Sequence, residues 1–336
     1  MHSAHARLFV AVCAACVLLP LASRQPALAA GERLQPLPDP NLLGPPEDVP
    51  AGDAMPADEA WYPDGVMSWP STRPTPSQGL PWLPQFLPDG LVWRSYLAGV
   101  KEPRFALVSA DNSAWGTIWD STLGGRVSLL RYGTPNAYRP EGWEVQFEGA
   151  AMPRLWPTRE SSPLISCDYR VGIPLVYANG NWQFKTGYSH LSAHLGDEFM
   201  VITGTLDRSN YIRDSWMFAV GYFYTENLRL YAEMDYAFVI GGGSEPFEFQ
   251  FGFDYSPAVI GGAPFAAMYG NLREELNFGG YWVVQAGWQW RGGPAMRTFR
   301  VGVEYINGAP TQYEFTHFEP YAQFEQQVGI GVWYDY

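Results

Sequence analysis

The sequence contains few cysteines, almost no lysine and, beyond its N-terminus, no long apolar run. Only 3 of its 336 residues are Cys and only 16% are charged, with a net charge of −13. A surface that binds nucleic acid needs clustered Lys and Arg, so the scattered arginines of this acidic chain argue against a nucleic-acid partner. After the N-terminus no stretch reaches the ~18 consecutive apolar residues that a membrane-spanning helix needs.

The N-terminus carries the features of a secretory signal peptide. Arg7 supplies positive charge, an apolar run extends from Leu8 to Leu21, and Ala27-Leu28-Ala29 provides an A-x-A cleavage site. The run is too short for a transmembrane helix. We therefore predict that residues 1–29 are removed on export. Two of the three cysteines leave with them, so the mature chain keeps only Cys167 and forms no internal disulfide.

Aromatic residues and prolines are abundant. Aromatic side chains make up 16% of the sequence, with 14 Trp and 20 Tyr. Residues 30–88 are dense in Pro, Asp and Glu, and proline neither donates to a β-ladder nor continues a helix. We predict a proline-rich periplasmic leader over residues 30–88, largely without regular structure.

Residues 89–336 follow a different pattern, in which apolar and polar residues alternate. In 247–255 the odd positions hold four Phe and one Tyr, while the even positions hold Glu, Gln, Gly and Asp. Similar alternation recurs in 165–177, 280–291 and 299–305. A period of two indicates a strand with one apolar face. Glycine and charges of both signs on the polar face suit a lumen, and aromatic residues near the strand ends suit a membrane interface.

The connections between these segments support the same fold. Short connections at 178–181, 225–227, 256–264 and 292–295 alternate with longer ones at 195–214, 239–246, 271–279 and 306–325. Outer-membrane barrels have short periplasmic turns and longer outer loops. We predict an all-β fold: a transmembrane antiparallel β-barrel of about 12 strands over residues 89–336, located in the outer membrane of a Gram-negative-type bacterium. The alternation is poorest between 91 and 133.

The chain ends on a strand whose apolar face terminates in an aromatic residue. Val328, Ile330, Val332, Tyr334 and Tyr336 share that face. This strand resembles the C-terminal recognition strand of barrels that the outer-membrane assembly machinery inserts. The resemblance implies that the assembly machinery and outer-membrane lipid are partners of this chain; the sequence does not fix its oligomeric state.

One polar group of residues stands out on the predicted lipid face. His190, Ser192 and His194 share the even parity of Trp182 and Phe184, and polar groups facing lipid are costly unless they find partners or serve a function. A His two residues from a Ser on a strand lies on the same face, where it can take the hydroxyl proton. Alternatives are that these residues belong to the polar interfacial rim, or that His190, His194 and Asp197 bind a metal ion.

The His-x-Ser pair on a barrel of this size resembles the outer-membrane phospholipase A family. That resemblance implies a serine lipid hydrolase in which His190 is the general base, Ser192 the nucleophile and Asn210 the residue that orients His190. It also implies calcium, for which Asp197, Glu198 and Asp207, and in addition Asp214, offer hard oxygen ligands. The family's Asn-Gly after the Ser is replaced here by Ala193-His194, and Asn210 lies further along the chain than the family's Asn.

Two other stretches resemble a bacterial exported family known as domain of unknown function 1207. They are Leu87 to Gly99, which includes Trp93-Arg94-Ser95-Tyr96, and His190 to Glu198. That resemblance implies a barrel and no established activity. Three functions therefore stay open: a structural or passive-transport barrel with a filled or narrow lumen, a lipid hydrolase, and an adhesion or assembly protein acting through the leader or the outer loops, residues 306–325 above all.

Overall fold

A computed structural model describes residues 79–205, 207–259, 261–292, 297–317 and 324–336. The predicted signal peptide, residues 1–29, and most of the predicted leader lie outside these residues. The described strands are β1 (Leu83–Phe86), β2 (Phe105–Asn112), β3 (Gly116–Gly133), β4 (Gly142–Leu155), β5 (Leu164–Asn179), β6 (Trp182–Leu195), β7 (Ile212–Phe223), β8 (Leu228–Gly241), β9 (Phe247–Tyr255), β10 (Gly261–Arg273), β11 (Gly279–Gly292), β12 (Arg297–Gly308) and β13 (Glu325–Asp335). Three short helical segments complete the fold: α2 (Asp197–Thr203), η2 (Glu274–Leu276) and η3 (Tyr313–Phe315).

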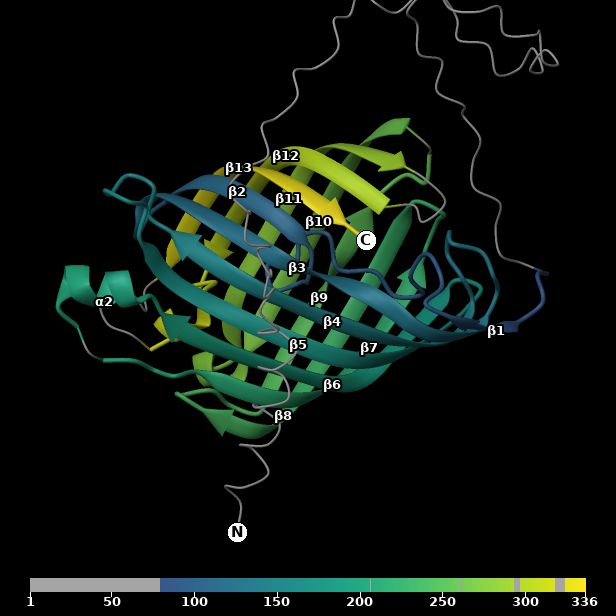
Figure 1. Cartoon of the computed structure of the whole chain (residues 1–336), viewed down its shortest axis with the longest axis horizontal. Helices are drawn as coiled ribbons and strands as arrows, with labels where there is room; N and C mark the ends of the chain where they lie inside the picture. The colour runs from purple at the N-terminus through teal and green to yellow at the C-terminus, as the bar shows by residue number, and fades with distance from the viewer. Residues whose placement is uncertain (1–78, 206, 260, 293–296, 318–323) are drawn as a thin grey trace, which may run out of the picture. The chain divides into compact units, whose positions relative to one another are not determined.

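Strands β2 to β13 form a closed ring (Figure 1). Each pairs antiparallel with its neighbours in the chain, and the ring closes where β13 pairs with β2. Closure removes the free sheet edges on which barrels would otherwise aggregate. The predicted antiparallel barrel of about 12 strands is therefore confirmed. β1 lies outside the ring and pairs only with the end of β3, at Leu130 to Gly133, so this part of the predicted leader is a strand.

The two faces of the wall follow the predicted parity. On β11, Trp282, Val284 and Trp288 are exposed on the outer face, while Gln285 and Gln289 are buried inside. The same division holds for the aromatic and acidic residues of β9. A barrel with this distribution is apolar towards its surroundings and polar within.

No helix in the described part of the chain combines the length and the apolar character needed to cross a membrane.

The strand connections separate the two ends of the barrel. One end carries the short connections 180–181, 224–227 and 256–260 together with the C-terminus; we call it the terminal end (Figure 1). The other end carries the long connections 196–211 and 309–324, and we call it the loop end. The predicted alternation of short and long connections holds around β6 and β12, but not at the start of the barrel, where the loop-end connection 113–115 is shorter than the terminal-end connection 134–141.

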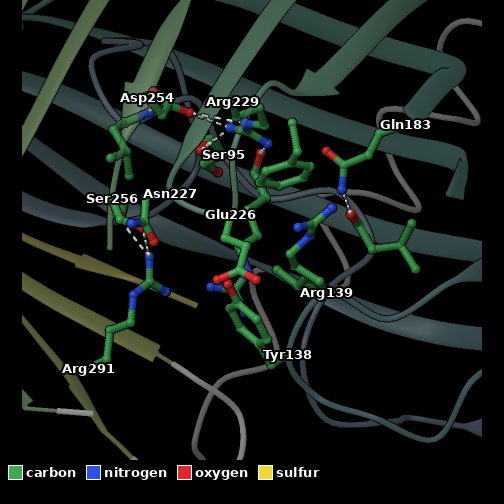
Figure 2. Close-up of a pocket in the computed structure, with 15 residues that line it drawn as sticks. Ser95, Tyr138, Arg139, Gln183, Glu226, Asn227, Arg229, Asp254, Ser256 and Arg291 are labelled. Atoms are coloured by element: carbon green, nitrogen blue, oxygen red, sulfur yellow. Dashed lines mark hydrogen bonds and ion pairs between the residues drawn. The ribbon is translucent and has the colours of Figure 1, made fainter. Parts of the chain in front are cut away.

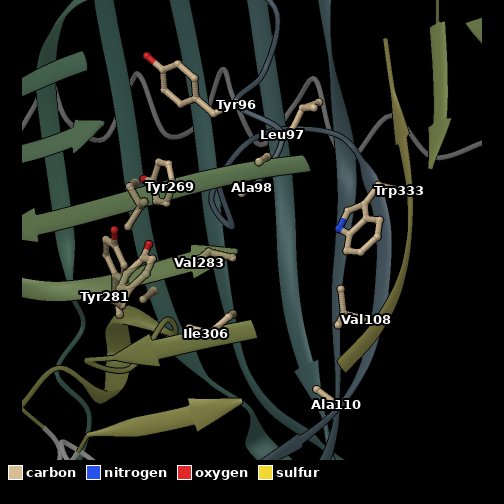
Figure 3. Packing of buried hydrophobic residues seen from close by; sticks show 14 of the residues in the cluster. Tyr96, Leu97, Ala98, Val108, Ala110, Tyr269, Tyr281, Val283, Ile306 and Trp333 are labelled. Carbon is tan, nitrogen blue, oxygen red and sulfur yellow. The ribbon is translucent and has the colours of Figure 1, made fainter. Parts of the chain in front are cut away.

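The lumen is filled by the chain itself. Residues 91–104, which we call the plug, precede β2 and lie inside the ring, where Trp93 and Tyr96 have no exposed surface. Tyr96 stacks on Tyr231 of β8 with ring centroids 3.8 Å apart. Figure 3 shows Tyr96, Leu97 and Ala98 of the plug among inward side chains of the wall. The plug explains the poor alternation after residue 91: these residues are buried within the barrel and do not form its wall.

Backbone atoms of the plug bond to polar side chains of the wall. Gln146 and Gln183 donate to the carbonyls of Trp93 and Val92 at 3.1 and 2.6 Å. The N–H of Leu97 donates to Asp254 at 3.0 Å, and its carbonyl accepts a bond from Arg300 at 3.1 Å. A buried backbone polar group is costly without a partner. These bonds therefore hold the plug in one position inside the barrel.

A second segment closes the lumen from the loop end. Residues 309–316, which we call the cap, belong to the β12–β13 connection and turn inward, and Tyr313 and Phe315 are fully buried. Tyr313 donates its hydroxyl proton to Glu248 at 3.0 Å, and its N–H donates to Asp168 at 3.1 Å. Plug and cap meet where Lys101 pairs with Asp168 at 2.5 Å and lies over the Tyr313 ring. This part of the predicted outer loop is therefore buried in the barrel.

The filled lumen gives a testable electrical prediction. The refolded protein in a planar bilayer is expected to show no stable single-channel conductance, because plug and cap occupy the path between the two ends. The measurement is single-channel recording over a range of voltages, with a refolded open porin as the positive control. Reproducible conductance steps from the intact chain would contradict a permanently sealed lumen.

Candidate active site

The candidate site lies on the outer face of β6, close to the loop end. Tyr188, His190 and Ser192 are each partly exposed and alternate with the buried Ser189 and Leu191. The expected placement of His190 and Ser192 on the outer face is therefore found. Together with Thr186 and the exposed His194, they make the outer face of β6 polar towards the loop end, whereas Trp182 and Phe184 keep it apolar towards the terminal end.

His190 is held by a carboxylate from the neighbouring strand. The register of β6 and β7 places His190 directly opposite Asp214. The His190 Nδ1 and the Asp214 Oδ1 are 2.7 Å apart. Both side chains are partly shielded, with 28% and 21% of their surface exposed, so the bond is less open to competing water than one between fully exposed groups.

Tyr188 secures the same carboxylate. Its hydroxyl donates to Asp214 Oδ1 at 2.7 Å, so one carboxylate oxygen accepts bonds from both Tyr188 and His190. The side chains of Tyr188 and His190 are two residues apart on one face of β6, and Asp214 bridges to them from β7. Two donors on one oxygen restrict the carboxylate to one rotamer, and the imidazole ring is restricted with it.

This arrangement determines what His190 can do. An ionised Asp214 accepts a proton-bearing Nδ1, which leaves the Nε2 of a neutral imidazole with its lone pair available. A base of this kind, oriented by a carboxylate and close to a hydroxyl, is the arrangement that activates serine nucleophiles.

Ser192 lies two residues further along the same face of β6. The spacing places its backbone roughly 6–7 Å from that of His190, within reach of an imidazole and a hydroxyl that turn towards each other. Among the described residues, His190 is hydrogen-bonded to Asp214 and not to Ser192. Catalytic hydrogen bonds are often long before substrate binds, so this spacing is compatible with a nucleophile–base pair.

Asn210 does not occupy the place that the sequence predicted for it. It precedes β7, its φ is 51°, and its N–H donates to Glu314 of the cap at 3.3 Å. Asp214 instead takes the position opposite His190. The difference arises because β7 begins only at Ile212, so a residue before it cannot pair with the middle of the β6 site.

The acidic residues proposed for calcium do not form a cluster. Asp197 and Glu198 are exposed in the first turn of α2, and Asp207 is exposed in the segment that follows this helix. Across the part of the chain that the structure describes, no group of three or more His, Cys, Asp or Glu side chains is placed to hold a metal ion. The alternative set of His190, His194 and Asp197 is likewise not brought together. His194 packs instead against Tyr169 of β5, with ring centroids 5.8 Å apart.

A β-bulge adjoins the site. The pairing of β7 with β8 shifts register between Asp214 and Ser215, and Phe238 of β8 lies at this irregularity. Its ring contacts those of Tyr188 and Trp216, with centroids 6.3 and 6.1 Å apart. Bulges redirect side chains next to functional sites. Here the bulge leaves Phe238, Val239 and Ile240 all exposed, which makes an apolar surface beside Asp214.

The closed ring, the apolar outer face and the polar interior define an outer-membrane-type β-barrel with a polar triad-like group on its outer wall. The family model described as "Protein of unknown function (DUF1207)" matches residues 52–336, and the chain belongs to this family. The predicted family resemblance is thus confirmed. A comparison with curated proteins finds no match.

Solved outer-membrane barrels are among the structures similar to this chain. Outer membrane phospholipase A from Escherichia coli is 13% identical with a TM-score of 0.47, covering 69% of this chain and 95% of that one. The calcium-bound dimer of the Salmonella typhi phospholipase is 12% identical with a TM-score of 0.46, covering 69% and 91%. The KdgM porin in complex with disordered oligogalacturonate is 12% identical with a TM-score of 0.40, covering 69% and 99%. At these identities the likeness concerns the fold.

Proposed function

We propose that this protein is an outer-membrane enzyme that hydrolyses lipid esters at the outer face of its barrel. Ser192 is the nucleophile, His190 the general base, and Asp214 the residue that orients His190. The observation that carries the proposal is the 2.7 Å hydrogen bond between His190 and Asp214, beside Ser192 and on the face turned to lipid. The position suits a substrate that arrives along the membrane, since an ester at the level of the head groups meets this part of the wall.

The proposed reaction follows the chemistry of serine esterases. His190 Nε2 takes the proton of Ser192 as its Oγ attacks the ester carbonyl, and the carbonyl electrons move to oxygen. Collapse of this intermediate expels the alcohol, which receives the proton from His190. Water, deprotonated by His190, then attacks the acyl-serine carbonyl. Collapse of this second intermediate releases the fatty acid, and His190 returns the proton to the Ser192 Oγ. Asp214 stabilises the imidazolium that forms in each half of the reaction.

The lumen supports this location for the chemistry. Plug and cap bury the interior, so the pathway for a passive solute is filled by side chains of the protein. The outer wall is a surface that a lipid substrate can reach. The Phe238–Ile240 surface offers an apolar contact for an acyl chain next to Asp214.

The test is a hydrolysis assay on the refolded mature chain in detergent. Release of fatty acid from mixed phospholipid micelles is expected, together with covalent labelling of Ser192 by a lipid-like fluorophosphonate, located by peptide mass spectrometry. Ser189 provides an internal comparison, since it lies on the same strand and faces the interior. Parallel assays with calcium and with a chelator test the prediction that calcium assists through Asp197, Glu198 and Asp207. If a protein shown to be folded gives no fatty-acid release and no labelling of Ser192, the enzymatic role is refuted.

A second candidate function is that of a structural barrel. The plug and the cap together favour it, because both are tied into the wall by ion pairs and hydrogen bonds that a passive scaffold would need for rigidity. In that case His190, Ser192 and Asp214 are rim residues that meet lipid head groups. A folded protein without hydrolysis would then leave this candidate as the leading one. In both cases we propose an outer-membrane location, with insertion by the barrel assembly machinery through Val328 to Tyr336.

A further inference from the structure

Part of the β3 edge has no partner strand. On this edge β2 pairs with Gly116 to Leu123, and β1 pairs with Leu130 to Gly133. Between β1 and β2 the chain leaves the wall at Leu87 and forms the plug before it returns. Residues 125–128 of β3 therefore pair with β4 on one side and with no described strand on the other. We call the opening beside residues 125–128 the window.

The window opens on the outer face of the barrel. A cavity of about 440 Å³ lies there, and its lining includes Leu87, Val127 and Phe147, which are exposed apolar side chains. Tyr336 bounds the cavity on the side of β13, with its ring so close to Gly125 that a Cβ at that position would lie 2.7 Å from it. The cavity is thus continuous with the apolar outer wall, which faces lipid in an outer-membrane barrel.

A second outer cavity lies next to the window along β3 and β4. Its volume is about 460 Å³. The outward side chains of its lining are apolar or aromatic, and Phe86 of β1 is 75% exposed beside them. They are Leu130, Tyr132, Trp143, Val145 and Leu175. Together the two cavities make an apolar groove on the outer faces of β3 and β4, with room for the acyl chains of a lipid.

Polar atoms at the window lack partners from the protein. The N–H of Gly124 donates to the Arg104 carbonyl, and hydrogen-bonding directions alternate along a strand, so the N–H of Arg126 points to the same, uncovered edge. The Ser128 Oγ, buried behind this edge, has no hydrogen-bond partner among the described residues. An open sheet edge is costly where it faces lipid. The window therefore suits a ligand that brings hydrogen-bond acceptors as well as apolar chains.

Charged groups of both signs stand at the rim of the window. Arg297 of β12 and Asp89, which follows β1, are exposed and belong to its lining. The chain terminus at Tyr336 adds a second negative charge. Exposed charges are costly in hydrocarbon, so the rim lies at the level of lipid head groups. A head group that carries both a phosphate and an ammonium complements such a rim.

The interior behind the window is balanced in charge and fixed in position. Arg126, which also lines the window, pairs with Glu102 at 3.1 Å and with Glu148 at 2.5 Å. Further inside, Arg229 of β8 holds the plug by donating to the carbonyl of Ser95 at 3.1 Å (Figure 2). The charges available to a ligand are therefore those of the rim.

We propose that the window binds one zwitterionic glycerophospholipid of the surrounding membrane. The lipid phosphate lies at Arg297, whose planar N–H donors match phosphate oxygens, and the ammonium lies at Asp89 and the chain terminus. The ester oxygens face the uncovered edge of β3, and the acyl chains follow the groove. An anionic head group is disfavoured because it brings no cation for Asp89. The His190 site near the loop end takes no part in this binding.

The proposal is tested by native mass spectrometry of the full refolded chain titrated with phosphatidylethanolamine or phosphatidylglycerol of identical acyl chains. The chain carries Ser192→Ala, so the lipid is not consumed if the proposed hydrolysis occurs. One phosphatidylethanolamine is expected to bind saturably, about five-fold more tightly than phosphatidylglycerol, the effect of one charge near a head group. Asp89→Asn, an exposed position, should reduce this preference to about one-fold, and Arg297→Gln should weaken binding of both lipids.

A variant of the groove separates a built site from lipid that coats the whole wall. Val127→Trp fills the window from its outer face and should lower binding of both lipids by roughly ten-fold or more. Val303→Trp is the matched control, since Val303 is equally apolar and exposed on β12 but does not line either cavity. No saturable binding, full binding by Val127→Trp, or a head-group preference that is absent or unchanged in Asp89→Asn would overturn the proposal.

Discussion

Asp214→Ala is expected to lower lipid-ester hydrolysis by about 10²-fold or more, whereas Asn210→Ala is expected to leave it within about two-fold. The reason is the position of the two residues relative to His190. Asp214 is hydrogen-bonded to the His190 Nδ1 at 2.7 Å, while Asn210 lies before β7 and bonds to the cap. Without Asp214 the imidazole loses its fixed orientation and its tautomer, and the imidazolium of the transition state loses its counter-charge.

The measurement is the initial rate of fatty-acid release in detergent, with kcat and KM determined separately. Ser192→Ala defines the background rate, and Ser189→Ala serves as the matched control on the inward face of the same strand. The loss in Asp214→Ala should appear in kcat, because Asp214 acts on the base and is not expected to contact the lipid. Equal losses in Asp214→Ala and Asn210→Ala would contradict the assignment, as would a change confined to KM.

Arg170→Leu is expected to destabilise the barrel by about 3–5 kcal/mol, the usual cost of removing one partner from a buried ion pair. Arg170 lies inside the ring on β5, where it is 4% exposed and bonds Glu148 of β4 at 3.0 Å. Arg126 bonds the other oxygen of Glu148 at 2.5 Å and Glu102 of the plug at 3.1 Å. Two of these four side chains are positively charged and two are negatively charged, so their charges sum to zero. Without Arg170, two buried carboxylates share one guanidinium.

Urea unfolding in detergent micelles, followed by tryptophan fluorescence, measures the change in the free energy of unfolding. Arg208→Leu is the control, since Arg208 is exposed in the connection after α2 and its loss should change stability by less than about 0.5 kcal/mol. The double variant Arg170→Leu with Glu148→Leu should recover part of the loss, because it removes one charge of each sign. Equal stabilities of Arg170→Leu and the wild type would show that the cluster is hydrated and contributes little.

The alternation of residues was sufficient to predict the wall of the barrel. Side chains of a strand alternate strictly between its faces, so Trp282 and Gln285 could be assigned to opposite sides before any pairing was known. The lengths of the connections, together with the apolar row that ends at Tyr336, then oriented the strands. The strand count needed only the number of alternating segments between turns.

The plug and the cap could not be predicted in this way. Neither has a period, and their burial depends on partners far away in the sequence, such as Asp254 for Leu97 and Glu248 for Tyr313. The stretch 91–104 has four charged residues and no alternation, which is nevertheless unusual so close to a first barrel strand. That contrast is the signal that would have indicated an inserted segment.

The placement of the candidate site residues was predicted in part, for a related reason. Parity placed His190 and Ser192 on the outer face, because both lie on the same strand as the apolar Phe184. The third residue depends on the register between β6 and β7, and the long connection 196–211 leaves that register undetermined by turn geometry. Asp214 has the same even parity as Trp216, which lies two residues later on the outward face of β7. Knowledge of the residue at which β7 begins was what the choice between Asp214 and Asn210 lacked.

The junction of the plug with the last strand links two steps of assembly. Asp335 of β13 bonds Arg300 of β12 at 2.7 Å and also bonds Arg104, the last residue of the plug, at 3.1 Å. Directly after Arg104 the chain enters β2, whose pairing with β13 closes the ring. Closing the seam and docking the plug therefore depend on the same carboxylate. By thermodynamic linkage, the pairing of β13 with β2 and the docking of the plug favour each other to the same extent. The inserted plug therefore stabilises the closed seam of the barrel.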